Sequence, residues 1–201
     1  MPTAAKNKYL KRLRILDAAT RLFMDRSVSE TAIDDVVKLA GVAKGTFYLY
    51  FRDKYDLLDQ IVMCRTAALF TDSCRTMRER AESQQLDRAG QIEFLTDEII
   101  ARMREDRKVT ALIDKRFSAC FSPKAMEEYP EMQTHIAYLA DLLTSPDCPP
   151  QEAMRRLYVL ADMIGCVCCD AILSERPYAI DELIPTIHSI LRKLTEVNEV
   201  D

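Results

Sequence analysis

The fold is decided at residues 40–51, AGVAKGTFYLYF. Gly41 is expected to end one short helix, because glycine readily takes the left-handed conformation of a helix C-terminus. A second short helix is expected over 44–51, with Phe47 and Phe51 on one side and polar or amphipathic residues on the other. Two short helices joined by a glycine turn form a helix-turn-helix pattern. The pattern predicts that the second helix enters a DNA major groove.

The flanking residues predict two more helices in the same head. Residues 9–26 have apolar positions at helical spacing. Thr31 followed by Asp34 indicates a capping box that opens the helix before Gly41. Asp53 is expected to cap a longer fourth helix that runs to about Glu82 and joins the head to the rest of the chain.

Charge is distributed unevenly along the 201 residues. Residues 1–54 contain 11 Lys and Arg against 6 Asp and Glu, whereas the remainder contains 17 against 26. A basic head on an acidic body indicates that only the head meets a polyanion. A solvated basic face is the alternative interpretation. The basic residues near the start of the chain could form a disordered arm on DNA or a solubilising tail: Lys6, Lys8, Lys11, Arg12 and Arg14.

Residues 14–58 resemble the DNA-binding domain of the TetR family of bacterial transcriptional regulators. The resemblance is carried by the run 40–51 together with Asp53-Lys54 and Leu57-Leu58. It implies an all-α protein with a three-helix head at residues 1–53 and a helical ligand-binding and dimerisation body at 54–201. It also implies a homodimer in which the last two long helices form a four-helix bundle with the partner chain.

The resemblance further implies which residues contact DNA. They are Lys44, Gly45, Thr46 and Tyr48 near bases and phosphates, Tyr50 and Lys54 on the backbone, and Thr31 at the start of the second helix. Lys44 could bond a guanine edge or a phosphate, whereas Tyr48 could instead be a core residue of the head. The chain departs from the family at Ala43 and Ala32, where a hydroxyl residue is common. Each departure removes a potential cap or phosphate contact.

The body is expected to be entirely helical, in keeping with only 4 glycines in the chain. Helices are predicted over 87–106, 109–121, 131–144, 151–174 and 180–197. Ser122-Pro123 should open a further short helix, and residues 144–150 form the clearest loop. Pro185 is expected near the first turn of the last helix, where its missing N–H has little cost.

The segment Leu157–Leu173 is apolar on two sides of a helix, so it needs a second cover besides its own core. A partner chain is the simplest cover. The predicted dimer interface comprises Val159, Gly165, Cys166, Leu173, Ile187, Ile190 and Leu191. Gly165 is assigned to it because a small residue allows two helices to approach closely.

Large apolar side chains in the body suggest a pocket for an apolar or aromatic small molecule, although such residues at helical spacing also suit a plain core. The candidate lining is Phe70, Met77, Phe94, Met103, Phe117, Phe121, Tyr138 and Met163. An alternative effector site is the thiol cluster Cys166, Cys168 and Cys169, which could sense oxidants or, shared across a dimer, bind a metal. The plain interpretation of these thiols is small apolar packing.

No apolar run has the length of a secretion signal or a membrane span, so a cytoplasmic protein with reduced thiols is expected, with no membrane partner. No catalytic triad, phosphate loop or four-ligand metal set is visible. The sequence therefore predicts no enzyme, cofactor or metal. It predicts a homodimeric repressor that a small-molecule effector releases from a palindromic double-stranded DNA operator. A helical interaction protein without operator binding remains a further hypothesis.

Overall fold

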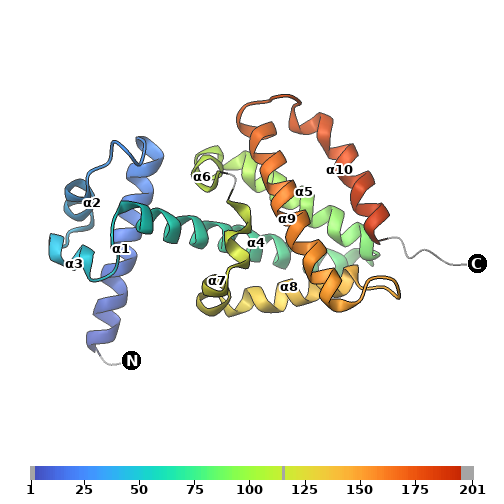
Figure 1. Cartoon of the computed structure of the whole chain (residues 1–201), viewed down its shortest axis with the longest axis horizontal. Helices are drawn as coiled ribbons and strands as arrows, with labels where there is room; N and C mark the ends of the chain where they lie inside the picture. The colour runs from blue at the N-terminus through green and yellow to red at the C-terminus, as the bar shows by residue number, and fades with distance from the viewer. Residues whose placement is uncertain (1–2, 115, 196–201) are drawn as a thin grey trace, which may run out of the picture. The chain divides into compact units, whose positions relative to one another are not determined.

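The computed structural model describes residues 3–114 and 116–195, which form helices joined by short connections (Figure 1). The helices are α1 (Thr3–Asp25), α2 (Ile33–Ala40), α3 (Lys44–Tyr48), α4 (Lys54–Gln84), α5 (Arg88–Glu105), α6 (Arg107–Ile113), the 3-10 helix η1 (Phe117–Phe121), α7 (Pro123–Glu128), α8 (Pro130–Leu143), α9 (Pro150–Leu173) and α10 (Ile180–Thr195). Within these residues the only β pairing is an isolated bridge between Ser145 and Cys148. The predicted all-α class is confirmed.

The chain divides into two compact units, an N-terminal unit over Met1–Cys64 and a C-terminal unit over Arg65–Asp201. Helix α4 has residues in both units. The domain boundary expected between residues 53 and 54 falls at the start of this helix and stays a prediction.

The N-terminal unit packs α1 against α2, and α2 against the short helix α3. Its core includes Ile15 of α1, Val36 of α2, and the two aromatic residues Phe47 and Phe51, all at most 2% exposed. Gly41 ends α2 as predicted, with φ +63° and ψ +43°, and its N–H donates to the carbonyl of Lys38. Glycine fits here because other residues rarely adopt this positive φ.

Three local predictions in this unit are wrong. The helix after the glycine turn ends at Tyr48 instead of residue 51, although the N–H groups of Tyr50 and Phe51 still donate to the carbonyl of Phe47. The capping box is absent, because α2 has Ala32 at its N-cap and no side-chain cap. The N-terminal basic residues are not a disordered arm from residue 3 onward, because α1 begins at Thr3.

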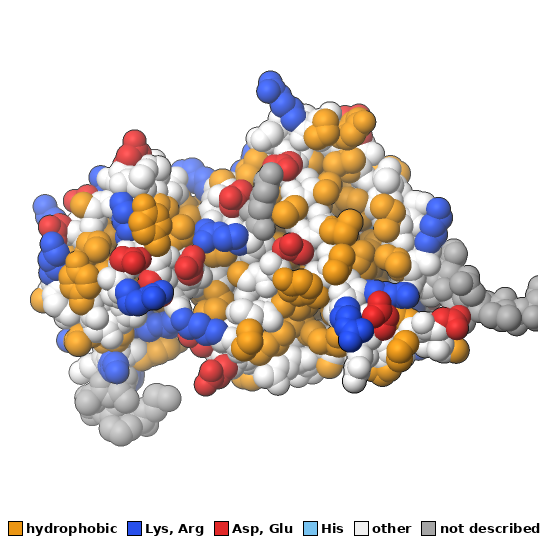
Figure 2. All heavy atoms as spheres, in the orientation of Figure 1, with side chains coloured by type: hydrophobic (Ala, Val, Ile, Leu, Met, Phe, Trp, Pro, Cys, Tyr) orange, Lys and Arg blue, Asp and Glu red, His pale blue; other side chains and the backbone are white. Residues whose placement is uncertain are grey.

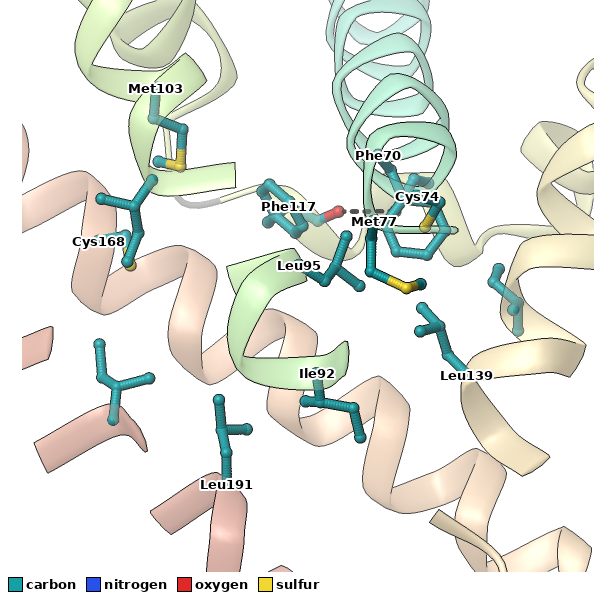
Figure 3. Close-up of a cluster of buried hydrophobic side chains, with 14 of the residues drawn as sticks. Phe70, Cys74, Met77, Ile92, Leu95, Met103, Phe117, Leu139, Cys168 and Leu191 are labelled. Carbon is teal, nitrogen blue, oxygen red and sulfur yellow. Dashed lines mark hydrogen bonds between the residues drawn. The ribbon is translucent and has the colours of Figure 1, made fainter. Parts of the chain in front are cut away.

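The C-terminal unit surrounds a hydrophobic core to which α4, α5, η1, α8, α9 and α10 contribute. Figure 3 shows buried side chains from these helices converging on one another. The predicted starts at residues 87 and 122 are confirmed: Asp87 accepts a hydrogen bond from the N–H of Gly90, and Ser122 accepts one from the N–H of Ala125. Side-chain acceptors at these positions satisfy N–H groups that the first helical turn leaves without partners.

Two predictions for the body are corrected. The single helix expected over 109–121 is instead α6 and η1, because the chain leaves the helical conformation at Asp114, with φ +50° and ψ −140°. Pro185 is the sixth residue of α10, so it lies beyond the first turn and removes the helical bond to the carbonyl of Asp181. The expected end of this helix at 197 lies outside the described residues. No described helix combines the length and apolar character that crossing a membrane requires.

Candidate nucleic-acid interface and internal cavity

Helix α3 is fixed to the N-terminal unit by two aromatic side chains. Phe47 is fully buried and Phe51 is 2% exposed, and their ring centroids lie 5.6 Å apart. Tyr48 packs edge-on against Phe47, with 5.3 Å between centroids, yet 54% of its surface is exposed. The alternative that Tyr48 is a core residue is therefore wrong. One side of α3 is anchored, and the other faces solvent.

The solvent-facing side of α3 begins with Lys44 and Gly45. A Cβ added to Gly45 would meet no atom within 4 Å beyond its chain neighbours and its own helix backbone. Since its φ is not positive, the fold gives no steric reason for glycine here. Glycine in a helix costs roughly 0.5–1 kcal/mol relative to alanine. Glycine at this position allows an external molecule to approach the backbone of α3 closely.

Two lysines border this surface, and both have partners. The Nζ of Lys44 lies 2.8 Å from a carboxylate oxygen of Asp34, and both side chains are more than half exposed. The hydrogen bond and the negative charge of Asp34 raise the pKa of Lys44 above its ordinary value. The Nζ of Lys54 donates to the carbonyls of Ser29 (2.7 Å) and Thr31 (3.2 Å). Lys54 thereby supports the loop before α2 while its charge stays near the surface.

An open surface hollow brings together four of the predicted DNA-binding residues: Thr31, Lys44, Tyr48 and Lys54. Asp53 also lines it. The Oδ1 of Asp53 accepts hydrogen bonds of 2.8 Å from the N–H groups of Asp56 and Tyr55, which lower the pKa of Asp53 and confirm its capping role. The hollow thus lies beside the N-terminus of α4, a place where helices favour negative charge.

Three of the predicted contact residues, one of which lines the hollow, are placed less favourably for a DNA contact. Thr31 is 1% exposed, and its hydroxyl donates to the carbonyl of Ser27 at 3.0 Å, so this hydroxyl is not presented at the surface. The hydroxyl of Tyr50 donates to the carbonyl of Lys8 at 3.0 Å and ties the turn after α3 to α1. Thr46 is half-buried and lies outside the hollow. Arg12 also has a structural role, because it donates to Gln60 at 2.9 Å.

Sequence reasoning missed two exposed residues of this region, Leu49 and Tyr55. Tyr55 lines the hollow. Leu49 follows Gly45 by one helical turn on the side away from Phe47, a spacing that could have identified it.

A narrow apolar cavity of about 60 Å³ lies within the C-terminal unit. Three of the eight predicted pocket residues line it, Phe70, Met103 and Phe117 (Figure 3). Most of its wall comes from residues that the prediction omitted: Ile92, Leu95, Thr96, Ile99, Leu139, Leu143, Leu157, Leu160, Ala161, Ile164, Gly165, Cys168 and Leu191. Several of these form the inward stripe of α9, and the periodicity of that helix groups them on one side without indicating that this side faces inward.

The other five predicted pocket residues do not line this cavity. Met163 is 61% exposed, so its assignment to an interior pocket is wrong. Met77 is fully buried in the core, and Phe94 packs against the core with the guanidinium of Arg80 5.9 Å from its ring centroid. Phe121 stacks edge-on with both Phe70 and Tyr158, and Tyr138 donates a 2.5 Å hydrogen bond to Gln91.

The cavity offers few polar partners to a ligand. Thr96 supplies the one hydroxyl of its lining, and that hydroxyl donates to the carbonyl of Ile92 at 2.9 Å. No charged side chain lines it. Transfer of a charged group into such surroundings is unfavourable without a partner. The cavity therefore suits an apolar, uncharged compound, and it is smaller than the roughly 300–1,000 Å³ of typical ligand sites.

The predicted dimer residues separate into two groups. Gly165, Ile187 and Leu191 are buried in their own chain, so their assignment to an interface is wrong. Gly165 lies against Phe117, whose Cβ would be 2.5 Å from a Cβ added to the glycine. Cys166 and Leu173 are half-buried.

Val159 and Ile190 are each 50% exposed. Together with Met163 and Val167, at 61% and 43%, they define what we call the outer apolar face: Val159, Met163 and Val167 of α9 and Ile190 of α10. Figure 2 shows hydrophobic side chains spread over the side of the C-terminal unit where α9 lies. A helical stripe at spacings of four residues, exposed and apolar, is typical of a surface that another chain covers.

The thiol cluster has little capacity for chemistry. Cys168 is fully buried, and burial raises the pKa of its thiol to about 12. The thiol of Cys169 is 1% exposed and donates to the carbonyl of Asp114. A thiol that stays protonated at neutral pH is a poor nucleophile and metal ligand. Across residues 3–114 and 116–195, no three His, Cys, Asp or Glu side chains are grouped to hold a metal ion.

Buried thiols predict a loss of stability in alkali. Burial raises the pKa of Cys74, Cys120 and Cys168 to about 12, from an ordinary value near 9. Between these values the unfolded chain releases protons that the folded chain retains, so rising pH favours unfolding. At pH 10 each thiol should lower the free energy of unfolding by about 1.4 kcal/mol relative to neutral pH. Denaturant titrations at pH 7.5 and 10 measure this loss.

The control is a comparison of one single variant with the wild type. Cys168→Ala should reduce the alkaline loss by one thiol's share. An alkaline loss that is identical in Cys168→Ala and wild type would contradict the buried, protonated thiol.

Comparison with known proteins agrees with this geometry. The sequence pattern described as "Bacterial regulatory proteins, tetR family" matches residues 15–61, which cover the helix-turn-helix. The HTH-type transcriptional regulator AcrR of Shigella flexneri is 46% identical over 50 residues, which are 25% of this chain and 23% of that protein. The chain thus spans less than a third of the length of this curated relative.

Solved structures share the fold over nearly the whole chain. The multidrug binding protein EbrR, crystallised with imidazole, has a TM-score of 0.59 and 20% identity, covering 94% of this chain and 92% of that one. The fatty acid degradation regulator FadR of Bacillus halodurans has a TM-score of 0.53 and 17% identity, covering 94% and 98%.

The anchored α3 and the glycine turn define a helix-turn-helix domain, followed by a helical body. Over residues 15–61 the chain is similar to the TetR family of bacterial regulatory proteins, as the resemblance predicted. AcrR is described as a transcriptional regulator, and FadR as a regulator of fatty acid degradation.

Proposed function

We propose that the protein is a homodimeric repressor that binds a palindromic DNA operator and is released from it by a small apolar ligand. The observation that carries this proposal is the arrangement of α3. One side is anchored by Phe47 and Phe51, and the other presents Lys44, Tyr48 and an unobstructed backbone at Gly45. A recognition helix needs both properties, because it must be held firmly while base edges approach it closely.

Phosphates and bases would be contacted by different residues of this surface. A phosphate can compete with Asp34 for the exposed ammonium of Lys44, since exposed ion pairs are weak. Tyr48 and Lys54 line the hollow at the start of α4, which suits a second phosphate. Tyr50 acts indirectly, by holding the start of α1 beside the recognition turn through its bond to Lys8. Thr46 remains a candidate for base contact from its half-buried position.

Ligand and DNA would be linked through α4. Phe70 is the α4 residue that lines the cavity, and the same helix begins at Lys54, in the N-terminal unit. The cavity as it stands is small, so a ligand must expand it and favour a different packing around Phe70. A ligand that binds better to a DNA-incompetent state shifts the population toward that state. The related EbrR is named for multidrug binding and FadR for fatty acid degradation, which supports an apolar effector here.

The thiol- or metal-responsive alternative has weaker support. Its cysteines are buried or half-buried, and the pKa of the Cys168 thiol is raised to about 12. The outer apolar face instead favours a role for α9 and α10 in association between two copies of the chain.

Replacing Gly45 with alanine tests the recognition surface. Alanine fits the free protein and favours the helix, so the free energy of unfolding should rise by about 0.5–1 kcal/mol. DNA affinity should nevertheless fall by about tenfold or more, because the new methyl group separates the backbone of α3 from the groove. Thermal melting and fluorescence anisotropy with a selected duplex measure the two effects.

The matched control is Gly90→Ala, which adds the same methyl group to the first turn of α5 in the other unit. It should leave DNA affinity unchanged. An unchanged affinity in Gly45→Ala as well would remove this face of α3 from the DNA interface.

A further inference from the structure

Leu49 has the highest exposure of any large hydrophobic residue in the part of the chain that the structure describes, at 76%. This exposure does not come from a loosely held segment. Leu49 is the C-cap of α3, with φ −74° and ψ −19°, and the next two N–H groups donate to the carbonyl of Phe47 at 2.9 and 3.0 Å. The side chain is therefore held in the open by a fixed backbone.

The position of Leu49 on α3 places it in the middle of the proposed DNA-contacting face. At 100° per residue it projects between Gly45 and Thr46, on the side away from the buried ring of Phe47. Gly45 lies one turn earlier and has no Cβ, so the helix surface beside Leu49 is open. Lys44 and Tyr48 flank the same side and are more than half exposed.

On a face that meets DNA, an exposed leucine held by a fixed backbone can gain an apolar partner in the groove. The major groove of DNA presents one apolar group on its base edges, the C5-methyl of thymine. We propose that Leu49 is a specificity-determining residue that reads a thymine of the operator through its methyl group. This inference rests on the proposed function, since it requires α3 to lie in the major groove.

Charge favours DNA over a protein partner at this site. Residues 1–54 carry 11 basic and 6 acidic residues, and Lys44 begins the short helix whose C-cap is Leu49. On α3 and its C-cap, Leu49 is the one exposed aliphatic side chain, and a basic surface with such a side chain fits a polyanion whose groove carries methyl groups. A protein-binding patch would be expected to show several apolar residues together.

The test replaces thymine by deoxyuridine, which removes only the methyl group. A duplex is first selected from a random pool by the full chain, and each thymine is then replaced singly. At one position in a half-site, wild-type affinity should fall about fourfold, the effect of removing one buried methyl group. The variant Leu49→Ala should bind the thymine and deoxyuridine duplexes equally, whereas Leu49→Met should still distinguish them.

A second exposed leucine provides a control for the protein side. Leu39 lies on α2 and is 53% exposed, and Leu39→Ala should keep the full discrimination. Discrimination that survives in Leu49→Ala, or is lost in Leu39→Ala alone, would overturn the assignment. So would a Leu49→Ala variant that binds all duplexes like wild type but associates differently with a second copy of the chain.

The failure of this inference can be told apart from failure of the proposed function. If no duplex is enriched by selection, the protein is not a sequence-specific DNA-binding protein, and both the proposed function and the inference about Leu49 are overturned. If a duplex is enriched but no deoxyuridine substitution changes its affinity, only the reading of thymine by Leu49 is overturned.

Discussion

Glutamate at both Met163 and Ile190 is expected to convert a dimer into a folded monomer and to lower operator affinity by about 10²-fold or more. These side chains are 61% and 50% exposed on α9 and α10, so charges there are tolerated in the isolated chain. In a dimer whose two copies meet at the outer apolar face, the same charges would be buried opposite the same charges of the partner chain. Burial of unpaired like charges strongly opposes association.

The loss of DNA affinity follows from geometry. A palindromic operator has two half-sites, and a dimer binds the second without a further loss of translational freedom. Analytical ultracentrifugation measures the oligomeric state, thermal melting shows whether the variant is folded, and duplex titration measures operator affinity. The matched control is Ala137→Glu, at an exposed position of α8 outside the outer apolar face. A double variant that remains dimeric would place the interface elsewhere.

Enlarging Gly165 is expected to destabilise the C-terminal unit without acting on the dimer directly. A Cβ at this position would lie 2.5 Å from the Cβ of Phe117 and 2.7 Å from its Cγ. Because the nearest atom is next to the backbone of η1, rotation of the ring cannot relieve the overlap. Gly165→Ala should therefore lower the free energy of unfolding by about 3 kcal/mol, and Gly165→Leu by more.

Thermal melting at a fixed protein concentration checks this result, with a fall in Tm of about 10 °C expected for the alanine variant. Ala137→Leu adds bulk at an exposed position of α8 and should melt like wild type. If Gly165→Ala kept the wild-type Tm but sedimented as a monomer, Gly165 would belong to the dimer interface after all.

Features set by neighbouring residues could be predicted from the sequence. The glycine turn and the anchoring rings of α3 lie within a dozen residues of one another, and the caps at Asp53, Asp87 and Ser122 depend on residues two or three positions away. Such local patterns define the helix-turn-helix without knowledge of the remaining chain. The family assignment rests on the same stretch.

Features set by distant residues could not be predicted from the sequence. Thr31 matches a capping pattern, but it is buried, and Lys54, which lies 23 positions later, donates to its carbonyl. The small size of Gly165 predicts a place in an interface, whereas its neighbour Phe117 lies 48 positions earlier in the chain. On α9, Met163 is exposed and the next residue, Ile164, lines the cavity, since one residue turns the helix by 100°. Periodicity alone does not say which side of a doubly apolar helix faces inward.

Sequence-specific DNA binding through α3 is tested by the affinity of the full chain for a selected duplex and for a scrambled duplex of equal composition, both at 150 mM salt. We expect the selected duplex to bind at least about 10³-fold more tightly. Equal affinity for the two duplexes, lost in parallel as salt rises, would show binding by charge alone and would rule out sequence recognition by α3.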